Sequence, residues 1–167
     1  MKNRELLDIV DEYDNIIGVS ERDIVHREKL LHRSVHIFVF NSKGEIFVQK
    51  RAATKSEHPG KYDSSAAGHI DTGESYDDAA KRELIEELSI DSRLELLAKF
   101  DACSKTDGEF VQLYTTICDN EIKIDLREIE EGHFWEITTL KDRVNSDESV
   151  FTPAFILLFE YYLKHAI

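Results

Sequence analysis

Apolar and polar residues alternate in short runs over much of the chain, and turn-forming residues separate the runs. This pattern predicts β-strands. Leu6–Val10 and Ile16–Val19 flank the turn-like segment Asp11–Asn15, so we expect an N-terminal β-hairpin. Further strands are expected at His32–Phe40, Glu45–Lys50, Leu94–Asp101, Glu109–Cys118 and His133–Ile137.

Helical signals occur at three places. Glu74–Leu88 repeats apolar residues at helical spacing, which predicts an amphipathic helix. Thr152 followed by proline is a favoured helix start, so a C-terminal helix is expected to run to about His165. Ser20 and Asp23 have the spacing of an acidic capping box and predict a short helix after them. Strands combined with a central and a terminal helix indicate an α/β or α+β fold with a mixed sheet.

The composition fits one folded domain and argues against several partners. The 167 residues are 41% hydrophobic, enough for a single core. With 21 Lys and Arg against 34 Asp and Glu, the net charge of −13 repels nucleic-acid polymers. The longest apolar run, near Ala154–Phe159, is too short to span a membrane. The N-terminus lacks the apolar segment of a signal peptide, so we expect a cytoplasmic protein. In that compartment Cys103 and Cys118 are expected to be buried, reduced thiols.

Three carboxylates are expected to share one face of the central helix, because Glu83, Glu86 and Glu87 stand at i, i+3 and i+4. Like charges this close destabilise a bare helix, and no lysine has the spacing to neutralise all three. A hard divalent cation such as Mg²⁺ or Mn²⁺ would remove the repulsion. Taken without its surroundings, the pair of adjacent glutamates also fits a solvated acidic helix.

The residues around this cluster support the metal interpretation. Gly68 precedes the helix in an expected loop, where a glycine allows close approach of the backbone and its carbonyl can serve as a metal ligand. Arg82 is expected to point away from Glu83, toward Glu74 or Glu86. Its guanidinium would then hold the loop to the helix.

The stretch from residue 68 to residue 90 matches the Nudix box, G-x5-E-x7-R-E-U-x-E-E-x-G-U, where U is aliphatic. The matching residues are Gly68, Glu74, Arg82, Glu83, Leu84, Glu86, Glu87 and Ile90. Ser89 stands where the box has its second glycine, at the helix exit. A serine in a left-handed conformation there costs about 1 kcal/mol and removes no ligand.

Segments on both sides of the box resemble the isopentenyl-diphosphate isomerase-like branch of the Nudix superfamily, which contains isomerases and hydrolases. The similar segments are His32–Lys50, Arg51–Lys55, His58–Tyr62, Ala67–His69 and Phe151–Phe155. The resemblance implies a single Nudix domain over residues 1–167, with residues 1–31 as an N-terminal hairpin extension. It also implies an α/β/α sandwich around a mixed sheet.

For a Nudix hydrolase, the resemblance implies attack of water on a phosphorus of a nucleoside diphosphate joined to a group X, or of a related small substrate. Glu83, Glu86, Glu87 and the Gly68 carbonyl would hold Mg²⁺ or Mn²⁺, with Arg82 and Glu74 as further active-site residues. Arg51 and Lys55 either contact the diphosphate or lie on the surface. The general base stays open among the box glutamates and Asp107, Glu109, Glu128 and Glu131.

Two other functions remain as alternatives. The isomerases carry a cysteine acid or base directly before the Gly-His pair, and this chain has Ala67 there. Proton transfer to carbon needs such a group, whereas the carboxylates needed for diphosphate hydrolysis are intact. A non-catalytic nucleotide-binding module is the third interpretation, and the intact ligand set argues against it.

The resemblance also draws attention to three histidines. His32 aligns with a metal-binding histidine of the isomerases, His26 falls within a residue of another, and His69 follows Gly68. Together they can hold a second metal softer than Mg²⁺, such as Zn²⁺. The two further glutamate ligands of the isomerases are not evident, and Gln112 lies near one expected position. We therefore favour a hydrogen-bonding role for the histidines.

Two apolar features have open roles. Strand aromatics can stack a base, although a place in the core is favoured; they are Tyr62, Phe110, Tyr114, Phe134 and Trp135. Phe155–Leu163 is expected to be either the apolar face of a packing helix or a homodimer contact.

Overall fold

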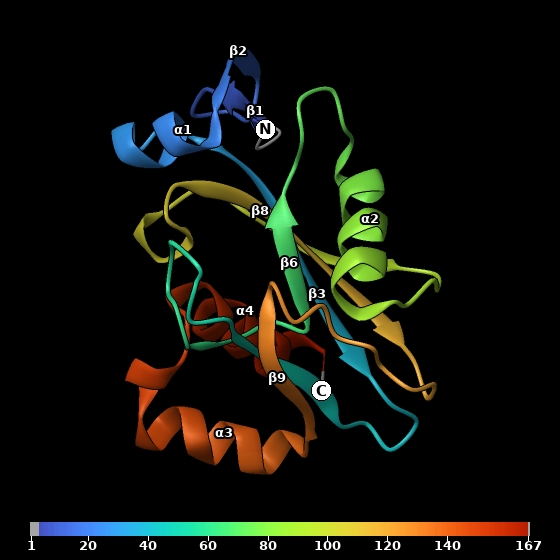
Figure 1. Cartoon of the computed structure of the whole chain (residues 1–167). Helices are drawn as coiled ribbons and strands as arrows, with labels where there is room; N and C mark the ends of the chain where they lie inside the picture. The colour runs from blue at the N-terminus through green and yellow to red at the C-terminus, as the bar shows by residue number, and fades with distance from the viewer. Residues whose placement is uncertain (1–3, 167) are drawn as a thin grey trace.

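The structure, a computed structural model, describes residues 4–166, so residues 1–3 and 167 of the expected domain lie outside the described residues. Its main sheet is mixed and has seven strands (Figure 1). β3 (His32–Phe40) is parallel to β8 (Glu109–Ile117) and antiparallel to β6 (Ala66–His69). The other strands are β4 (Ile46–Arg51), β5 (Tyr62–Asp63), β7 (Glu95–Phe100) and β9 (Ile129–Trp135).

The main sheet divides into two halves. β3 and β4 are paired at one position, where Phe40 lies opposite Ile46 beside their connecting turn. Beyond that point β3 pairs with β6, whereas β4 pairs with β5 and β9. A cavity takes its lining from both halves, with Ser34 from β3, Ala67 from β6 and Asp63 from β5. The cavity therefore lies where the two halves of the sheet separate.

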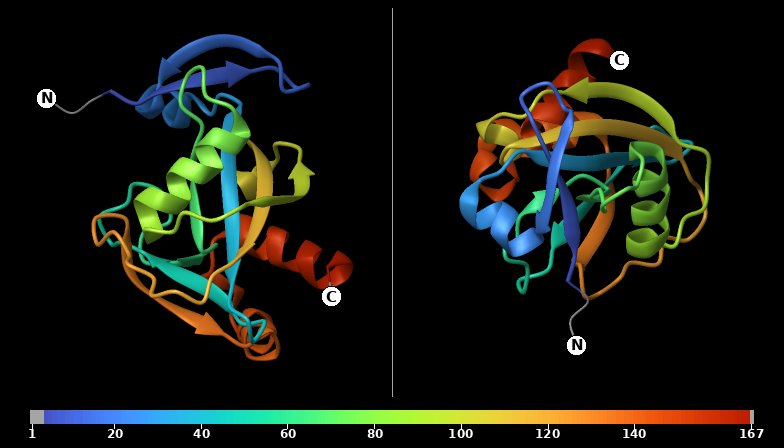
Figure 2. Two further views of the ribbon diagram at one scale, coloured as in Figure 1. Left: turned by 90° about the vertical axis from the view of Figure 1, so that its right-hand side faces the viewer. Right: turned by 90° about the horizontal axis from the view of Figure 1, so that it is seen from above.

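Helices cover both faces of the sheet, which confirms the expected α/β/α arrangement (Figure 2). α2 (Tyr76–Leu88) packs on one face, and α3 (Ile137–Ser146) and α4 (Pro153–His165) pack on the other. The alternation along β3 explains this layering, because successive side chains point to opposite faces. Ile37 belongs to the core under α2, and Phe38 belongs to the core under α4.

The predicted N-terminal hairpin is confirmed. β1 (Leu6–Val10) and β2 (Ile16–Glu21) form a separate two-stranded antiparallel sheet, and α1 (Arg22–Glu28) follows it. The Thr72 amide donates a hydrogen bond to the Leu6 carbonyl at 3.0 Å. This bond connects the hairpin to the loop before α2, so the hairpin lies beside the cavity.

Two expectations about local structure were wrong, and one helix was missed. α1 has no side-chain cap, because Ser20 continues β2 opposite Leu7 and the helix begins after Glu21. Gly68 lies in the short strand β6 rather than in a loop. α3 was not expected; its N-cap residue, Glu136, makes no capping hydrogen bond and gave no start signal.

The C-terminal helix is confirmed, with its capping bond from the Phe155 amide to the Thr152 hydroxyl at 3.1 Å. Its apolar face packs in the core, so the first of its two expected roles is correct; Phe155 and Phe159 are almost fully buried there. Cys118 is buried as expected, whereas Cys103 is exposed because it lies at the start of a surface turn. Within residues 4–166, no helix is long and apolar enough to cross a membrane.

Candidate active site

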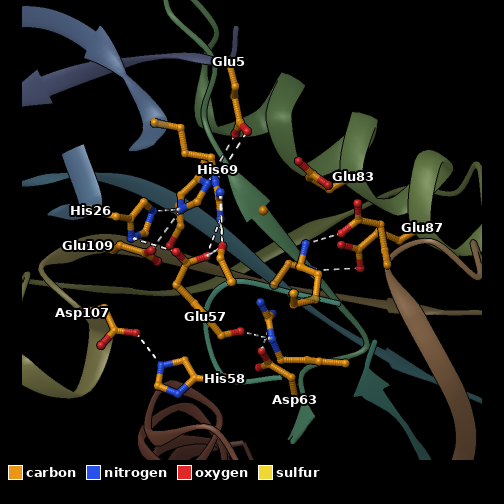
Figure 3. A pocket seen from close by; sticks show the side chains of 18 of the residues that line it. Glu5, His26, Glu57, His58, Asp63, His69, Glu83, Glu87, Asp107 and Glu109 are labelled. Atoms are coloured by element: carbon orange, nitrogen blue, oxygen red, sulfur yellow. Dashed lines mark hydrogen bonds and ion pairs between the residues drawn. The ribbon is translucent and has the colours of Figure 1, made fainter. Parts of the chain in front are cut away.

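A cavity of about 1510 Å³ lies beside α2 and brings together segments that are far apart in the sequence. Glu83 and Glu87, from α2, lie on one side of it (Figure 3). His26 from α1 and His69 from β6 lie across from them, next to Glu109 from β8. The site thus has two groups of potential metal ligands, one of carboxylates and one rich in histidine.

Arg82 fixes the loop before α2 to the helix. Its Nε and Nη2 donate to the two oxygens of Glu74 at 2.8 and 2.9 Å, and Nη2 also donates to the His69 carbonyl at 3.0 Å. Nη1 donates to Glu86 at 3.3 Å and to Glu83 at 2.6 Å. The expectation that Arg82 points away from Glu83 was wrong, because the long side chain reaches carboxylates on both sides of itself.

Glu87 is a buried carboxylate, and Glu83, one turn earlier on α2, is a largely buried one. The side chain of Glu83 is 13% exposed and Glu87 is 6% exposed, whereas the side chain of Glu86 is 59% exposed. Burial raises the pKa of Glu83 to about 7, although Arg82 opposes the shift. Burial and the charge of Glu83 raise the pKa of Glu87 well above its usual range.

Glu87 has only neutral hydrogen-bond donors. The Gln49 amide donates to it at 2.9 Å and the Ala67 N–H at 3.4 Å. Among residues 4–166, no lysine, arginine or histidine forms an ion pair with Glu87. Two buried carboxylates without enough cationic partners are a donor set that suits a hard divalent cation.

Gly68 lies against the Glu83 carboxylate. A Cβ atom at position 68 would overlap the carboxylate group of Glu83. The absence of a side chain therefore allows the close approach that the sequence led us to expect of this glycine.

The second group consists of His26, His32, His69 and Glu109, whose ligand atoms all lie within 4.8 Å of one another. The Nε2 atoms of His26 and His69 are 3.1 Å apart. The Glu109 Oε1 lies 3.2 Å from the Nε2 of His69 and 3.3 Å from that of His32. Ligand atoms around a tetrahedral zinc ion are about 3.3 Å apart. These separations fit one metal ion.

The second ring nitrogen of each histidine faces an oxygen atom. The three pairs are His32 with the Leu30 carbonyl at 2.8 Å, His69 with Glu5 at 3.4 Å and His26 with Glu57 at 3.8 Å. Such partners are typical of metal-binding histidines, because they orient the ring and leave the Nε2 lone pair for the metal. The Nε2 of His32 is buried and has no hydrogen-bond partner within residues 4–166.

Without a cation, the cluster is held together by charge. Burial opposes protonation of His69, but the hydrogen bonds that it donates to Glu109 and Glu5 outweigh burial and raise the pKa of His69 to about 9. Burial likewise opposes ionisation of Glu109, yet its close contacts with His32 and His69 hold its pKa well below the usual range. A metal ion can replace the proton that bridges these groups.

Glu109 is the carboxylate of this group, and the sequence did not reveal its place beside the histidines. The parallel register of β3 and β8 places it opposite His32. Gln112, near an expected ligand position, instead accepts a hydrogen bond from Tyr114 at 2.9 Å on the other face of β8. Val111 is the next residue on the face of Glu109, and it is buried and apolar. The cluster therefore contains one carboxylate.

The expected substrate-binding residues, Arg51 and Lys55, both line the cavity. The Arg51 guanidinium donates to Asp63 at 3.2 Å, and Lys55 pairs with Glu128. Of the candidate general bases, Asp107, Glu109 and Glu128 line the cavity. Glu131, on β9 opposite Lys50, is not among the residues that line it.

The strand aromatics are core residues rather than base-stacking groups. Tyr114 and Phe134 pack in the core under α2, and Tyr62 and Trp135 pack in the core under α4. Phe110 is also buried. None of these five lines the cavity.

Comparison with known proteins agrees with this architecture. A family model described as the NUDIX domain matches residues 30–155. The chain is 33% identical over 156 residues to isopentenyl-diphosphate Delta-isomerase 2 of Photorhabdus laumondii, covering 90% of this chain and 88% of that protein. It is 31% identical over 166 residues to an uncharacterized Nudix hydrolase of Nostoc sp., covering 97% and 98%.

A solved structure shows the same fold over nearly the whole chain. The DR0079 protein of Deinococcus radiodurans superposes with a TM-score of 0.84 at 27% identity, covering 94% of this chain and 98% of that one. The fold and the acidic helix beside its cavity define an enzyme of the pyrophosphohydrolase class. The chain belongs to the Nudix family.

The contact between Gly68 and Glu83 gives a first prediction. Gly68→Ala should weaken Mg²⁺ binding by about tenfold or more, because the new methyl group displaces a carboxylate ligand. Titration calorimetry measures the affinity. Gly18→Ala is the matched control, since a Cβ there would lie 3.9 Å from its nearest neighbour, Ile9. Equal Mg²⁺ affinity in wild type and Gly68→Ala would contradict this account of the site.

Proposed function

We propose that the chain is a metal-dependent hydrolase that cleaves the diphosphate linkage of a small molecule, such as a nucleoside diphosphate joined to a group X. The observation that carries the proposal is the pair of buried carboxylates, Glu83 and Glu87, in the wall of a polar cavity. Burying two like charges is costly unless a cation neutralises them. A protein of net charge −13 also needs a cation to admit an anionic substrate.

In this proposal Glu83, Glu86, Glu87 and the Gly68 carbonyl hold Mg²⁺ or Mn²⁺. The bound ion supplies charge neutralisation at the diphosphate oxygens and lowers the pKa of a coordinated water. Arg82 acts as a positioning residue: it holds the loop to the helix and keeps the carboxylates directed at one point.

Other side chains of the cavity orient the substrate, and a carboxylate takes a proton from the attacking water. Arg51 and Lys55 present positive charge to the diphosphate from the β4 side of the cavity. Glu109 is occupied by the histidines, and Asp107 accepts a hydrogen bond from His58 at 2.6 Å. Glu86 accepts a hydrogen bond from Arg82 and Glu128 pairs with Lys55, so the carboxylate that takes a proton from the attacking water stays open among Asp107, Glu86 and Glu128.

We further propose that His26, His32, His69 and Glu109 hold a second ion. Three imidazoles and one carboxylate suit Zn²⁺ or Mn²⁺ better than Mg²⁺. The convergence of the ligand atoms and the oxygen partners of the rings support ligation over the hydrogen-bonding role favoured from the sequence. The chain's own residues would then form two centres on opposite sides of the cavity.

Isomerisation of isopentenyl diphosphate is the alternative, favoured by relatives that carry that name. It needs an acid or base beside the Gly68–His69 pair, and Ala67 provides none. Val111, on the same face as Glu109, provides none either. The intact carboxylate set favours hydrolysis, and it also argues against a module that only binds nucleotides.

Hydrolysis should depend on the carboxylate site. Glu87→Gln should lower kcat by about 10³-fold, roughly 4 kcal/mol of barrier, because a metal ligand is lost. The assay separates by chromatography the phosphate and phosphomonoester products formed from a panel of nucleoside diphosphates, sugar nucleotides and dinucleotides with Mg²⁺ or EDTA. Glu160→Gln, on the exposed side of α4, is the matched control. Full activity in EDTA, or an unimpaired Glu87→Gln variant, would refute the metal-hydrolase proposal.

Isopentenyl diphosphate should not be isomerised. In deuterated water, no deuterium should enter the allylic product, because Ala67 can neither donate nor accept a proton. Mass spectrometry of the recovered diphosphates measures this. Clear incorporation of deuterium would restore the isomerase alternative.

The histidine cluster should bind one equivalent of Zn²⁺ after treatment with EDTA and back-titration. His69→Ala should lose this site, because its Nε2 is shared with both His26 and Glu109. Elemental analysis counts the metal. His165→Ala is the control, since that ring lies on α4 and bonds to the Tyr161 carbonyl. Absence of tight Zn²⁺ binding in the wild type would end the proposal of a second ion.

A further inference from the structure

β3 carries a row of polar side chains at positions where a central strand normally buries apolar ones. His32, Ser34 and His36 lie on the face of β3 that points away from α2. All three are at most 5% exposed. The next residue on that face, Phe38, returns to the core. His32 belongs to the histidine cluster, which leaves Ser34 and His36 without a role in either group of potential metal ligands.

Ser34 has an unused hydroxyl group. The residue is 2% exposed, it lines the cavity, and its Oγ has no hydrogen-bond partner within residues 4–166. A buried hydroxyl without a partner is destabilising. Such a group in the wall of a cavity is typical of a site that is completed by a ligand.

His36 is fixed by one nitrogen and free at the other. Its Nδ1 hydrogen-bonds to the Ser64 hydroxyl at 2.8 Å and lies 3.9 Å from Asp63. Among residues 4–166, no group hydrogen-bonds to its Nε2. His36 also lines the cavity, so the ring presents this nitrogen as a fixed hydrogen-bonding atom.

The two side chains lie between the two groups of potential metal ligands. In the antiparallel pairing of β3 with β6, Ser34 lies opposite His69 and His36 lies opposite Ala67. The Ala67 amide in turn faces Glu87 at 3.4 Å. A substrate whose diphosphate lies at the carboxylates would therefore place its adjoining group over Ser34, His36 and the small Ala67 side chain.

The rest of the cavity lining excludes two kinds of adjoining group. Within residues 4–166, no Phe, Tyr or Trp lines the cavity, and its rings are imidazoles. His26 and His69 belong to the histidine cluster and His58 bonds to Asp107, so these rings have other partners than a base. Its apolar side chains are limited to Leu6, Ala67 and Ala154, which is too little surface to cover an isoprenyl chain. The lining is otherwise polar or charged.

We propose that Ser34 and His36 form a subsite that binds the hydroxyl groups of a sugar attached directly to the diphosphate, without selecting a base. This inference rests on the hydrolase proposed above and names its substrate class. The hydroxyl of Ser34 and the Nε2 of His36 can each donate or accept, which matches neighbouring hydroxyls that do both. The sugar belongs either to a free sugar diphosphate or to a nucleoside diphosphate.

The test is binding of diphosphate analogues that resist hydrolysis, measured by calorimetry with Mg²⁺. The probes are the α,β-methylene analogues of ADP, CDP, 2′,3′-dideoxy-ADP and ribose 5-diphosphate. Wild type should bind the ADP analogue about tenfold more tightly than its dideoxy counterpart, since one or two hydrogen bonds are lost. The ADP and CDP analogues should agree within about threefold. The ribose 5-diphosphate analogue distinguishes the two sources of the sugar. A site directed at nucleoside diphosphates should bind it more weakly than the ADP analogue, whereas a site directed at free sugar diphosphates should not.

Ser34→Ala should reduce the preference for the hydroxylated analogue to within about twofold, and His36→Leu should do the same. Ser34→Ala removes a hydroxyl that has no protein partner, so its thermal midpoint should not fall below that of wild type. Ser42→Ala, in the exposed turn after β3, is the control and should keep the wild-type preference. Equal binding of the ADP and dideoxy-ADP analogues by wild type, or an unchanged preference in Ser34→Ala, would overturn the subsite. Failure of the hydrolase proposal would appear separately, as no metal-dependent cleavage of any diphosphate.

Discussion

Glu87 places a carboxylate in the protein interior with neutral hydrogen-bond donors only. Glu83 stands one turn away, where burial also raises its pKa. Folding the chain around this pair is unfavourable unless positive charge is supplied. Arg82 supplies part of it to Glu83 but none to Glu87. The surrounding structure keeps both carboxylates in the cavity wall, where a cation can reach them.

Several features of the fold serve that purpose together. The separation of β3 from β4 opens the cavity without exposing either core. Gly68 lets the helix carboxylate approach the sheet, and the Arg82 bonds to Glu74 and to the His69 carbonyl join the helix to β6. Because His69 lies in that same strand, the carboxylates and the histidine cluster share one rigid support.

The sequence predicted the parts of the site that are close together in the chain. The Nudix box lies in one strand, one loop and one helix, so its spacing translates directly into geometry. The histidine cluster joins four elements, and Glu109 enters it through the register of β3 with β8, which no local pattern encodes. Strand β6 escaped prediction because Ala66–His69 is short and made of small residues. Ser34 and His36 were missed because alternation along a central strand was taken only as a signal of secondary structure.

The most direct test of the central claim is the thermal unfolding midpoint of the protein in EDTA and in millimolar Mg²⁺. A cation that binds only the folded carboxylate site should raise the midpoint of wild type by several degrees. A Glu83→Gln, Glu87→Gln double variant should already be at least as stable in EDTA and should not respond to Mg²⁺, because its amides need no counter-charge. A wild-type midpoint that is unaffected by Mg²⁺, or an equal shift in the double variant, would contradict the view that these two glutamates form the metal site.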